Sequence, residues 1–152
     1  MDIAAADPFT TQGPLPAYRA KLASGELSHD SSQELAAERL QALWARLRGY
    51  DPPLKQENGG RLSRFLRRKK VDEAGEDRPN GLYLVGEVGR GKSMLMDLFF
   101  AAADLRRKKR VHFHRFMQDA HIRIHAWKRA NPATEDPIPP LADSIANEAA
   151  LL

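Results

Sequence analysis

The sequence predicts an α/β fold preceded by an α-helical N-terminal region. Three observations lead to this prediction. Residues 14–50 show helical periodicity, residues 81–85 form a short continuous apolar run typical of a buried strand, and a glycine-rich loop leads from that run into an apolar helix. The chain has 152 residues, of which 42% are hydrophobic and 29% charged, as in an ordinary globular protein.

The N-terminal part is expected to be helical. Residues 1–13 lack periodicity and are expected to be disordered. In the helical region over 14–50, a short helix stops near Gly25, and a longer amphipathic helix ends near Gly49. Asp30, with Gln33 three residues on, predicts a capping box at the start of the longer helix.

Proline and glycine then mark a charged linker over 51–79. Residues 80–152 are expected to form the α/β domain. The run at 81–85 predicts a strand buried on both faces, and 91–105 predicts a deeply packed helix finished by the basic residues 106–110. A second strand is expected at 111–114, followed by two further helices, one with Met117, Ala120, Ile124 and Trp127 on its apolar side and one with Leu141, Ile145 and Ala149.

Residues 86–93 match G-x-x-x-x-G-K-[ST], the P-loop or Walker A motif. Its glycines permit the backbone angles with which a loop wraps a phosphate in N–H groups. Lys92 is expected to place its charge at the β- and γ-phosphates, and Ser93 to offer its hydroxyl to Mg²⁺. The candidate nucleotide-binding residues are Gly86, Glu87, Val88, Gly89, Arg90, Gly91, Lys92 and Ser93, and the candidate metal ligand is Ser93.

Composition excludes several classes. Without cysteine the chain has neither disulfides nor thiolate zinc sites. The longest apolar stretch is interrupted by Asp97 and Asp104, and the N-terminus lacks the basic residues of a secretory or transit signal. We therefore expect a cytoplasmic protein without stable membrane insertion.

Two other functions stay open from the residues alone. The first alternative is a metal-binding module that uses His112, His114, His121 and His125. The first two would share one face of a strand, and the last two would share one face of a helix. The second alternative is a nucleic-acid-binding P-loop protein that binds through the basic clusters at 61–70 and 106–110. Neither is preferred, since no Asp, Glu or Cys stands at convincing ligand spacing from the histidines and two short basic runs make no continuous patch.

Residues 81–100 and 110–121 resemble two signatures of the family of the cell-division ATPase ZapE and its mitochondrial AFG-type relatives, and the likeness covers about residues 14–152. The resemblance implies an AAA+-like P-loop ATPase core that takes ATP and Mg²⁺. It also implies a protein partner such as an FtsZ-like division protein, a ring oligomer, and a pore-facing loop at Phe116 and Met117. It implies no metal for the histidines.

The sequence departs from the family at its C-terminus. Family members continue from a segment like 145–152 into a Walker B strand, whose Asp supports Mg²⁺ and whose Glu activates water. We therefore expect the chain to be an N-terminal fragment, with no catalytic residue of its own, that binds but does not hydrolyse ATP. Two strands without their native neighbours are also expected to favour aggregation.

Overall fold

The computed structural model describes residues 12–54, 81–132 and 136–152. These fall into two compact units. In the described part of the chain the first unit comprises 12–50 and 81–104, and the second comprises 51–54, 105–132 and 136–152. Most of the expected disordered terminus and linker, and the whole basic cluster at 61–70, lie outside the described residues. The expected domain boundaries therefore remain predictions.

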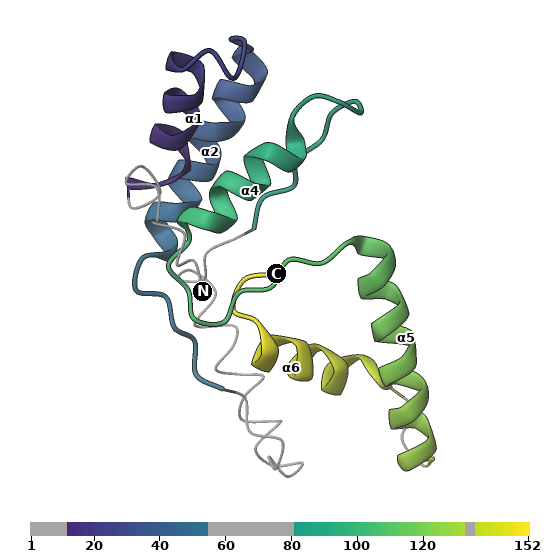
Figure 1. Cartoon of the computed structure of the whole chain (residues 1–152). Helices are drawn as coiled ribbons and strands as arrows, with labels where there is room; N and C mark the ends of the chain where they lie inside the picture. The colour runs from purple at the N-terminus through teal and green to yellow at the C-terminus, as the bar shows by residue number, and fades with distance from the viewer. Residues whose placement is uncertain (1–11, 55–80, 133–135) are drawn as a thin grey trace, which may run out of the picture. The chain divides into compact units, whose positions relative to one another are not determined.

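Three helices form the first unit: α1 (Pro14–Ala23), α2 (Ser31–Leu47) and α4 (Lys92–Ala102). Each of them contacts the other two, and Figure 1 shows them side by side. Their facing sides bury apolar side chains that supply the hydrophobic stabilisation of this unit. The buried residues are Pro14, Ala17, Tyr18, Ala37, Leu40, Leu43, Leu47, Leu95, Phe99 and Ala102. This confirms the three helices expected in these regions.

Helix α1 begins with a proline at its first position, where the missing N–H costs no hydrogen bond. Gln41 of α2 satisfies the polar groups around this start: its Oε1 accepts from Leu15 N at 3.1 Å and its Nε2 donates to Gln12 O at 3.0 Å. After the helix, Gly25 takes a φ of 78° and donates its N–H to Leu22 O. A glycine stop was expected at this position.

Helix α2 begins at the predicted cap. The Asp30 carboxylate accepts from Ser32 N at 2.8 Å and Gln33 N at 3.2 Å. The second half of the predicted capping box is wrong, because Gln33 does not return a bond to the cap. Its Oε1 is buried without a hydrogen-bond partner, and its Nε2 donates to Arg90 O instead. Gly49, with a φ of 75°, follows the helix as expected.

Helices α2 and α4 run in the same direction. At their N-terminal ends Asp30 pairs with Arg90, and at their C-terminal ends Trp44 Nε1 donates to Ala102 O at 2.9 Å. The last carbonyls of a helix receive no hydrogen bond from an N–H group of the same helix, and the Trp44 indole supplies the donor for one of them. Helix α2 and its cap therefore contact both the loop before α4 and the last residue of α4.

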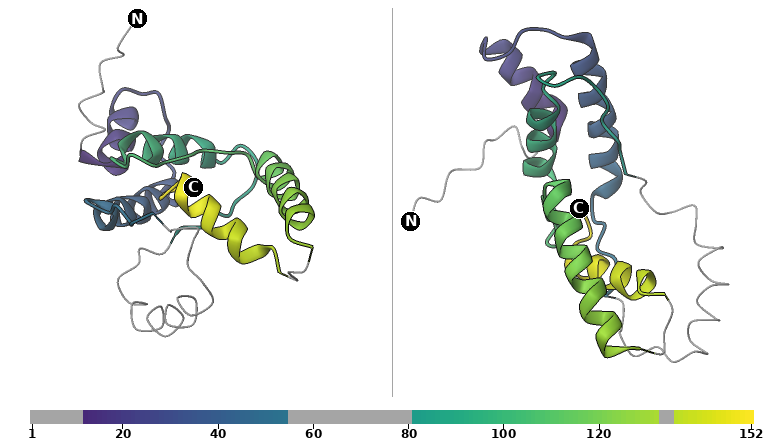
Figure 2. Two further views of the ribbon diagram at one scale, coloured as in Figure 1. Left: turned by 90° about the horizontal axis from the view of Figure 1, so that it is seen from below. Right: turned by 90° about the vertical axis from the view of Figure 1, so that its right-hand side faces the viewer.

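The second unit contains α5 (Phe113–Ala130) and α6 (Ile138–Glu148), which contact one another and are shown from two further sides in Figure 2. These helices confirm the last two that the periodicity predicted. An isolated parallel bridge joins Lys108 to Leu151. Lys109 N donates to Leu151 O at 2.9 Å, which places the segment before α5 beside the segment after α6.

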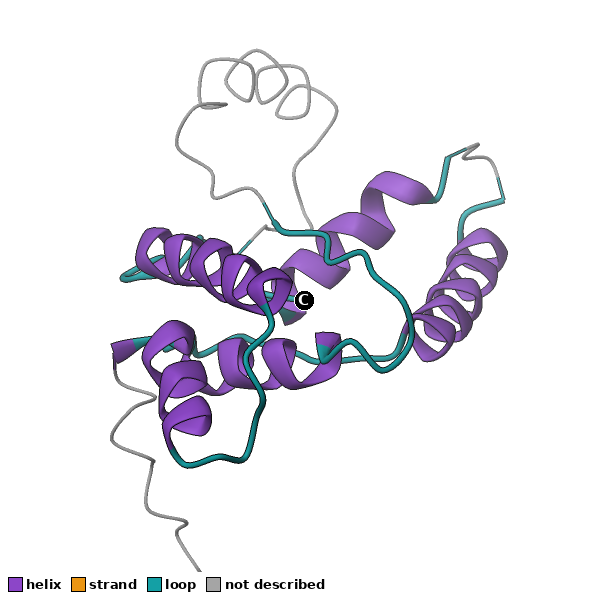
Figure 3. Ribbon diagram, turned by 90° about the horizontal axis from the view of Figure 1, so that it is seen from above, coloured by secondary structure: helices purple, strands orange, loops and turns teal. Residues whose placement is uncertain are grey.

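The α/β prediction is not confirmed. Within the described residues the structure has helices and loops but no strand, as Figure 3 shows. Residues 81–85 are irregular, and Tyr83 and Val85 are 91% and 82% exposed, so the predicted strand buried on both faces is wrong. The predicted strand at 111–114 is wrong as well, because α5 already begins at Phe113.

The basic run at 106–110 does not finish α4, which ends at Ala102. It lies at the C-terminal end of α6 instead. Arg107 Nη1 donates to the carbonyls of Ala146 and Asn147, both at 3.2 Å, and Lys109 pairs with Glu148 at 3.2 Å. Cations at this end of a helix are favoured by its dipole and bind its free carbonyls. Across the described part of the chain, no helix combines the length and apolarity needed to cross a membrane.

Candidate functional site

The P-loop lies immediately before α4, and its backbone has the shape that its glycines allow. Gly89 and Gly91 have φ angles of 83° and 78°, in the left-handed region that favours glycine. Lys92, directly after Gly91, is the first residue of a right-handed helix. A left-handed residue followed by a right-handed one turns successive N–H groups toward a common point, which makes an anion-binding concavity.

The start of α4 adds to this concavity. The first N–H groups of a helix have no acceptor within it, and the helix dipole places partial positive charge there. Ser93, whose hydroxyl was predicted as a metal ligand, is exposed in this first turn. The amides of Lys92 and Ser93 therefore face the position at which an anion is most stabilised.

Lys92 folds its side chain back over the loop. Its ammonium donates to the carbonyls of Gly86 at 2.8 Å and Glu87 at 2.6 Å. An ammonium has three N–H donors, so these two bonds fix the charge at the loop and leave a third donor for a phosphate oxygen. Glu87 O also accepts from Arg90 N at 3.4 Å, which closes the turn. Glu87 thus contributes its backbone to the loop.

The loop has room for a phosphate group. A Cβ added at Gly86 or Gly89 would meet nothing within 4 Å, and the Val88 side chain is 99% exposed. The left-handed glycines, the free amides and the lysine together fit a polyphosphate chain, and the Ser93 hydroxyl fits a Mg²⁺ ion, which prefers oxygen ligands. The structure therefore brings the eight predicted residues together on one loop and helix start.

The N-cap residue of α2 and one residue of its first turn contact this loop, and sequence reasoning did not assign them to it. The Asp30 carboxylate lies 3.0 Å from the Arg90 guanidinium, and Gln33 Nε2 donates to Arg90 O at 3.4 Å. The sequence marked both as capping residues only. Since 57 positions separate Gln33 from Arg90, no local pattern connects them.

The charge of Asp30 is well stabilised in this position. Hydrogen bonds from the backbone N–H groups of Gln33 and Ser32 lower the pKa of its carboxyl, and the Arg90 guanidinium lowers the pKa further. Asp30 therefore stays ionised beside the loop. Because Arg90 faces it, this negative charge is partly balanced at the place where a phosphate would bind.

The four histidines do not form a metal site. His112 precedes α5, His114 lies in its first turn, and His121 and His125 lie one turn apart further along, all of them exposed. Among the residues that the structure describes, no group of three or more His, Cys, Asp or Glu side chains could hold a metal ion. The structure therefore gives no support to the metal-binding alternative.

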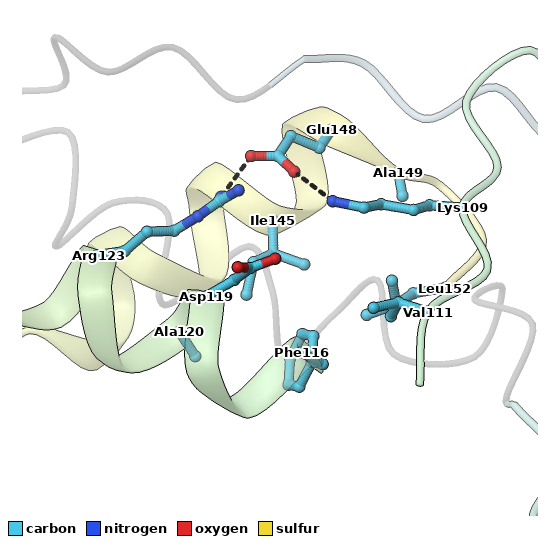
Figure 4. A pocket seen from close by; sticks show the side chains of 10 residues that line it. All are labelled: Lys109, Val111, Phe116, Asp119, Ala120, Arg123, Ile145, Glu148, Ala149 and Leu152. Atoms are coloured by element: carbon cyan, nitrogen blue, oxygen red, sulfur yellow. Dashed lines mark hydrogen bonds and ion pairs between the residues drawn. The ribbon is translucent and has the colours of Figure 1, made fainter. Parts of the chain in front are cut away.

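A small pocket lies in the second unit (Figure 4). Its volume is about 20 Å³, room for a water molecule and far too little for a nucleotide. Phe116, predicted to face a pore with Met117, lines this pocket from the first turn of α5, with Ile145 of α6 among the other lining residues. Glu148 lies above it between Arg123 and Lys109 and pairs with both.

A glycine-rich loop with a lysine and a serine at a helix start is the arrangement typical of P-loop nucleotide-binding proteins. Residues 12–152 match the family model of the AFG1-like ATPase, and the chain belongs to this family. The family resemblance stated from the two signatures is thus confirmed. Membership implies nucleotide binding.

Several curated proteins are similar to the chain in sequence. The chain is similar to the cell division protein ZapE of Escherichia coli K12, with 33% identity over 91% of this chain and 36% of ZapE. An uncharacterized protein of Schizosaccharomyces pombe is 33% identical over 95% of the chain and 36% of its own length. Lactation elevated protein 1 homolog B of Danio rerio is 49% identical over 49% of the chain and 16% of its own length.

The chain thus spans about a third or less of the length of these relatives, so the activity of a whole relative is not shown for it. No solved structure matches the chain.

Proposed function

We propose that this chain is the ATP-binding portion of a ZapE-like ATPase and that residues 86–93 hold the triphosphate with Mg²⁺. The observation that carries the proposal is the fixed ammonium of Lys92, held on the carbonyls of Gly86 and Glu87 at the N-terminus of α4. A localised cation, free amides and a helix dipole at one point are the means by which a P-loop binds phosphate.

Each residue has a limited role in this proposal. The amides around Gly91 and Lys92 bind phosphate oxygens, Lys92 neutralises charge on the β- and γ-phosphates, and the Ser93 hydroxyl is a ligand of Mg²⁺. The metal ion supplies further neutralisation of the phosphates when bound. The exposure of the loop allows the nucleotide to approach from solvent.

Hydrolysis needs one further group, which orients the attacking water. After the P-loop helix, the 152-residue sequence offers no apolar strand followed by an acidic pair for this role. We therefore infer that the 152-residue chain binds ATP without turning it over. In a protein with the length of its relatives, ATP hydrolysis would be coupled to action on a protein partner. From the likeness to ZapE, we propose that this action belongs to cell division.

Two measurements on the purified chain test the proposal. Calorimetric titration with ATP and Mg²⁺ is expected to show one saturable site that is lost in Lys92→Ala. Phosphate release is expected to stay at the level of buffer alone. Turnover that disappears in Lys92→Ala would contradict the inference about hydrolysis, and equal binding by both proteins would contradict the site.

A further inference from the structure

We propose that Gln33 of α2 positions the P-loop for phosphate binding by holding the peptide unit that joins Arg90 to Gly91. The proposal rests on the nucleotide-binding function proposed above, and it adds a positioning residue that lies outside the motif. Gln33 reaches the loop from α2, and it lies 57 positions before Arg90 in the sequence.

The argument begins with the geometry of one peptide. Gln33 Nε2 donates to Arg90 O at 3.4 Å, and no peptide bond in the described residues is cis. In a planar trans peptide the carbonyl of one residue and the N–H of the next point in opposite directions. Fixing the Arg90 carbonyl toward α2 therefore fixes the Gly91 N–H away from α2, on the side of the loop opposite Gln33.

The Gly91 N–H belongs to the row of amides that forms the anion-binding concavity with Lys92. Its direction decides whether it contributes to that concavity. A free glycine peptide adopts many orientations, because glycine has the widest range of backbone angles. Gln33 removes that freedom for one phosphate-binding donor without contacting the phosphate.

A second contact points to the same peptide. A Cβ at Gly91 would lie only 2.9 Å from Gln33 Nε2, so the amide of Gln33 packs directly against the Gly91 Cα. The neighbouring Asp30 holds the side chain of Arg90 at 3.0 Å. In contrast, Gly86 and Gly89 border open space. Support from α2 is thus concentrated on Arg90 and Gly91.

The contact with the Arg90 carbonyl requires a hydrogen-bond donor at position 33. A backbone carbonyl only accepts, so the Gln33 amide must present its NH₂ group to Arg90. Gln33→Glu keeps the shape and removes the donor at neutral pH, whereas a protonated Glu regains one O–H. Gln33→Met keeps a similar size and has neither donor nor charge. Both variants should fold, since position 33 lies in the first turn of α2, where an acid is favoured, and methionine has a high helix propensity.

The test measures the Kd for ATP with Mg²⁺ of the 152-residue chain and of each variant at pH 7.5 and pH 4, each variant relative to the parent at the same pH. At pH 7.5 we expect both Gln33→Glu and Gln33→Met to bind roughly three- to tenfold more weakly, the effect of one hydrogen bond. At pH 4, below the ordinary glutamate pKa of about 4.3, the deficit of Gln33→Glu should shrink, and that of Gln33→Met should not.

Gln41→Ala is the matched control, because Gln41 lies on the same helix and bonds to the start of α1 rather than to the P-loop. Measured below its melting temperature, it should bind like the parent. Binding that is lost in Lys92→Ala but unchanged in both Gln33 variants would overturn the role of Gln33 and leave the nucleotide site standing. A deficit in Gln33→Glu alone, or one without pH dependence, would also overturn it. No binding by the parent chain would overturn both proposals.

Discussion

Trp44 donates its indole N–H to the carbonyl oxygen of Ala102 at 2.9 Å, and this bond joins the C-terminal half of α2 to the last residue of the P-loop helix. Its position complements the contact of Gln33 and Asp30 with Arg90 at the other end. Helix α2 therefore holds α4 at both ends. The stability of the first unit and the geometry of the P-loop depend on the same helix.

Replacing Trp44 by phenylalanine tests the C-terminal contact. Trp44→Phe keeps an aromatic ring for packing and leaves the carbonyl of the buried Ala102 without its partner. We expect the free energy of unfolding to fall by about 1–2 kcal/mol, the cost of leaving a buried carbonyl without a hydrogen bond. Urea denaturation followed by circular dichroism measures this. Unchanged stability would show that the indole bond contributes nothing.

Two glycines of the P-loop should differ in their tolerance of alanine. Gly91→Ala places a Cβ on a left-handed residue and within 2.9 Å of the Gln33 amide, so we expect a loss of about 1–3 kcal/mol in stability. Gly86→Ala meets open space and should change stability by less than about 0.5 kcal/mol. Thermal denaturation of the two variants side by side gives the comparison. The opposite order would contradict the loop geometry.

Two substitutions of Asp30, the cap of α2, separate the effect of its charge from the effect of its hydrogen bonds. Asp30→Asn keeps an oxygen that accepts from Ser32 N and Gln33 N, whereas Asp30→Ala does not. We therefore expect the melting temperature of Asp30→Asn to stay close to that of the parent and that of Asp30→Ala to fall by a few degrees. If both variants fell equally, the ion pair with Arg90 rather than the cap would hold this end of α2.

Glu148 makes the stability of the second unit depend on pH. Hydrogen bonding from Arg123, and secondarily from Lys109, lowers the pKa of the Glu148 carboxyl below its ordinary value of 4.5. A carboxyl with a depressed pKa in the folded state stabilises the fold above its ordinary pKa, and this stabilisation is lost as the pH falls through the folded value. The contribution of Glu148 should thus be complete at pH 7 and decline below about pH 4.5.

The measurement for this prediction is urea denaturation of Glu148→Gln and the parent at pH 7 and pH 3. Because the side chains of Glu148 and its two partners are each more than a third exposed, solvent screens the pairs. We expect a loss of less than about 1 kcal/mol at pH 7. The difference between the two proteins should shrink at pH 3. A difference that grows with acid would contradict the assignment.

The sequence was informative wherever structure depends on neighbours along the chain. The Asp30 cap, the glycine stops at Gly25 and Gly49, and the five helices follow from capping groups and periodicity, and all are present. The P-loop also follows from a contiguous motif, and the structure places its residues at one helix start.

The failures concern relations between distant residues. A strand exists only beside a partner, so the apolar run at 81–85 could predict a tendency but not a pairing, and the described residues provide none. The second predicted strand failed because α5 begins at Phe113, within the residues that were assigned to it. The contact of Gln33 with Arg90 has no local signal, because tertiary packing alone brings α2 to the loop.

Nucleotide-dependent stabilisation tests the central claim most directly. A ligand that binds only the folded chain raises its stability by about 2.7 kcal/mol at a concentration of 100 times Kd. Thermal denaturation of the parent chain and Lys92→Ala is measured with and without ATP and Mg²⁺. A P-loop held by Lys92 predicts that the nucleotide raises the melting temperature of the parent by several degrees and leaves Lys92→Ala unchanged. An equal shift in both proteins, or none in the parent, would contradict the account.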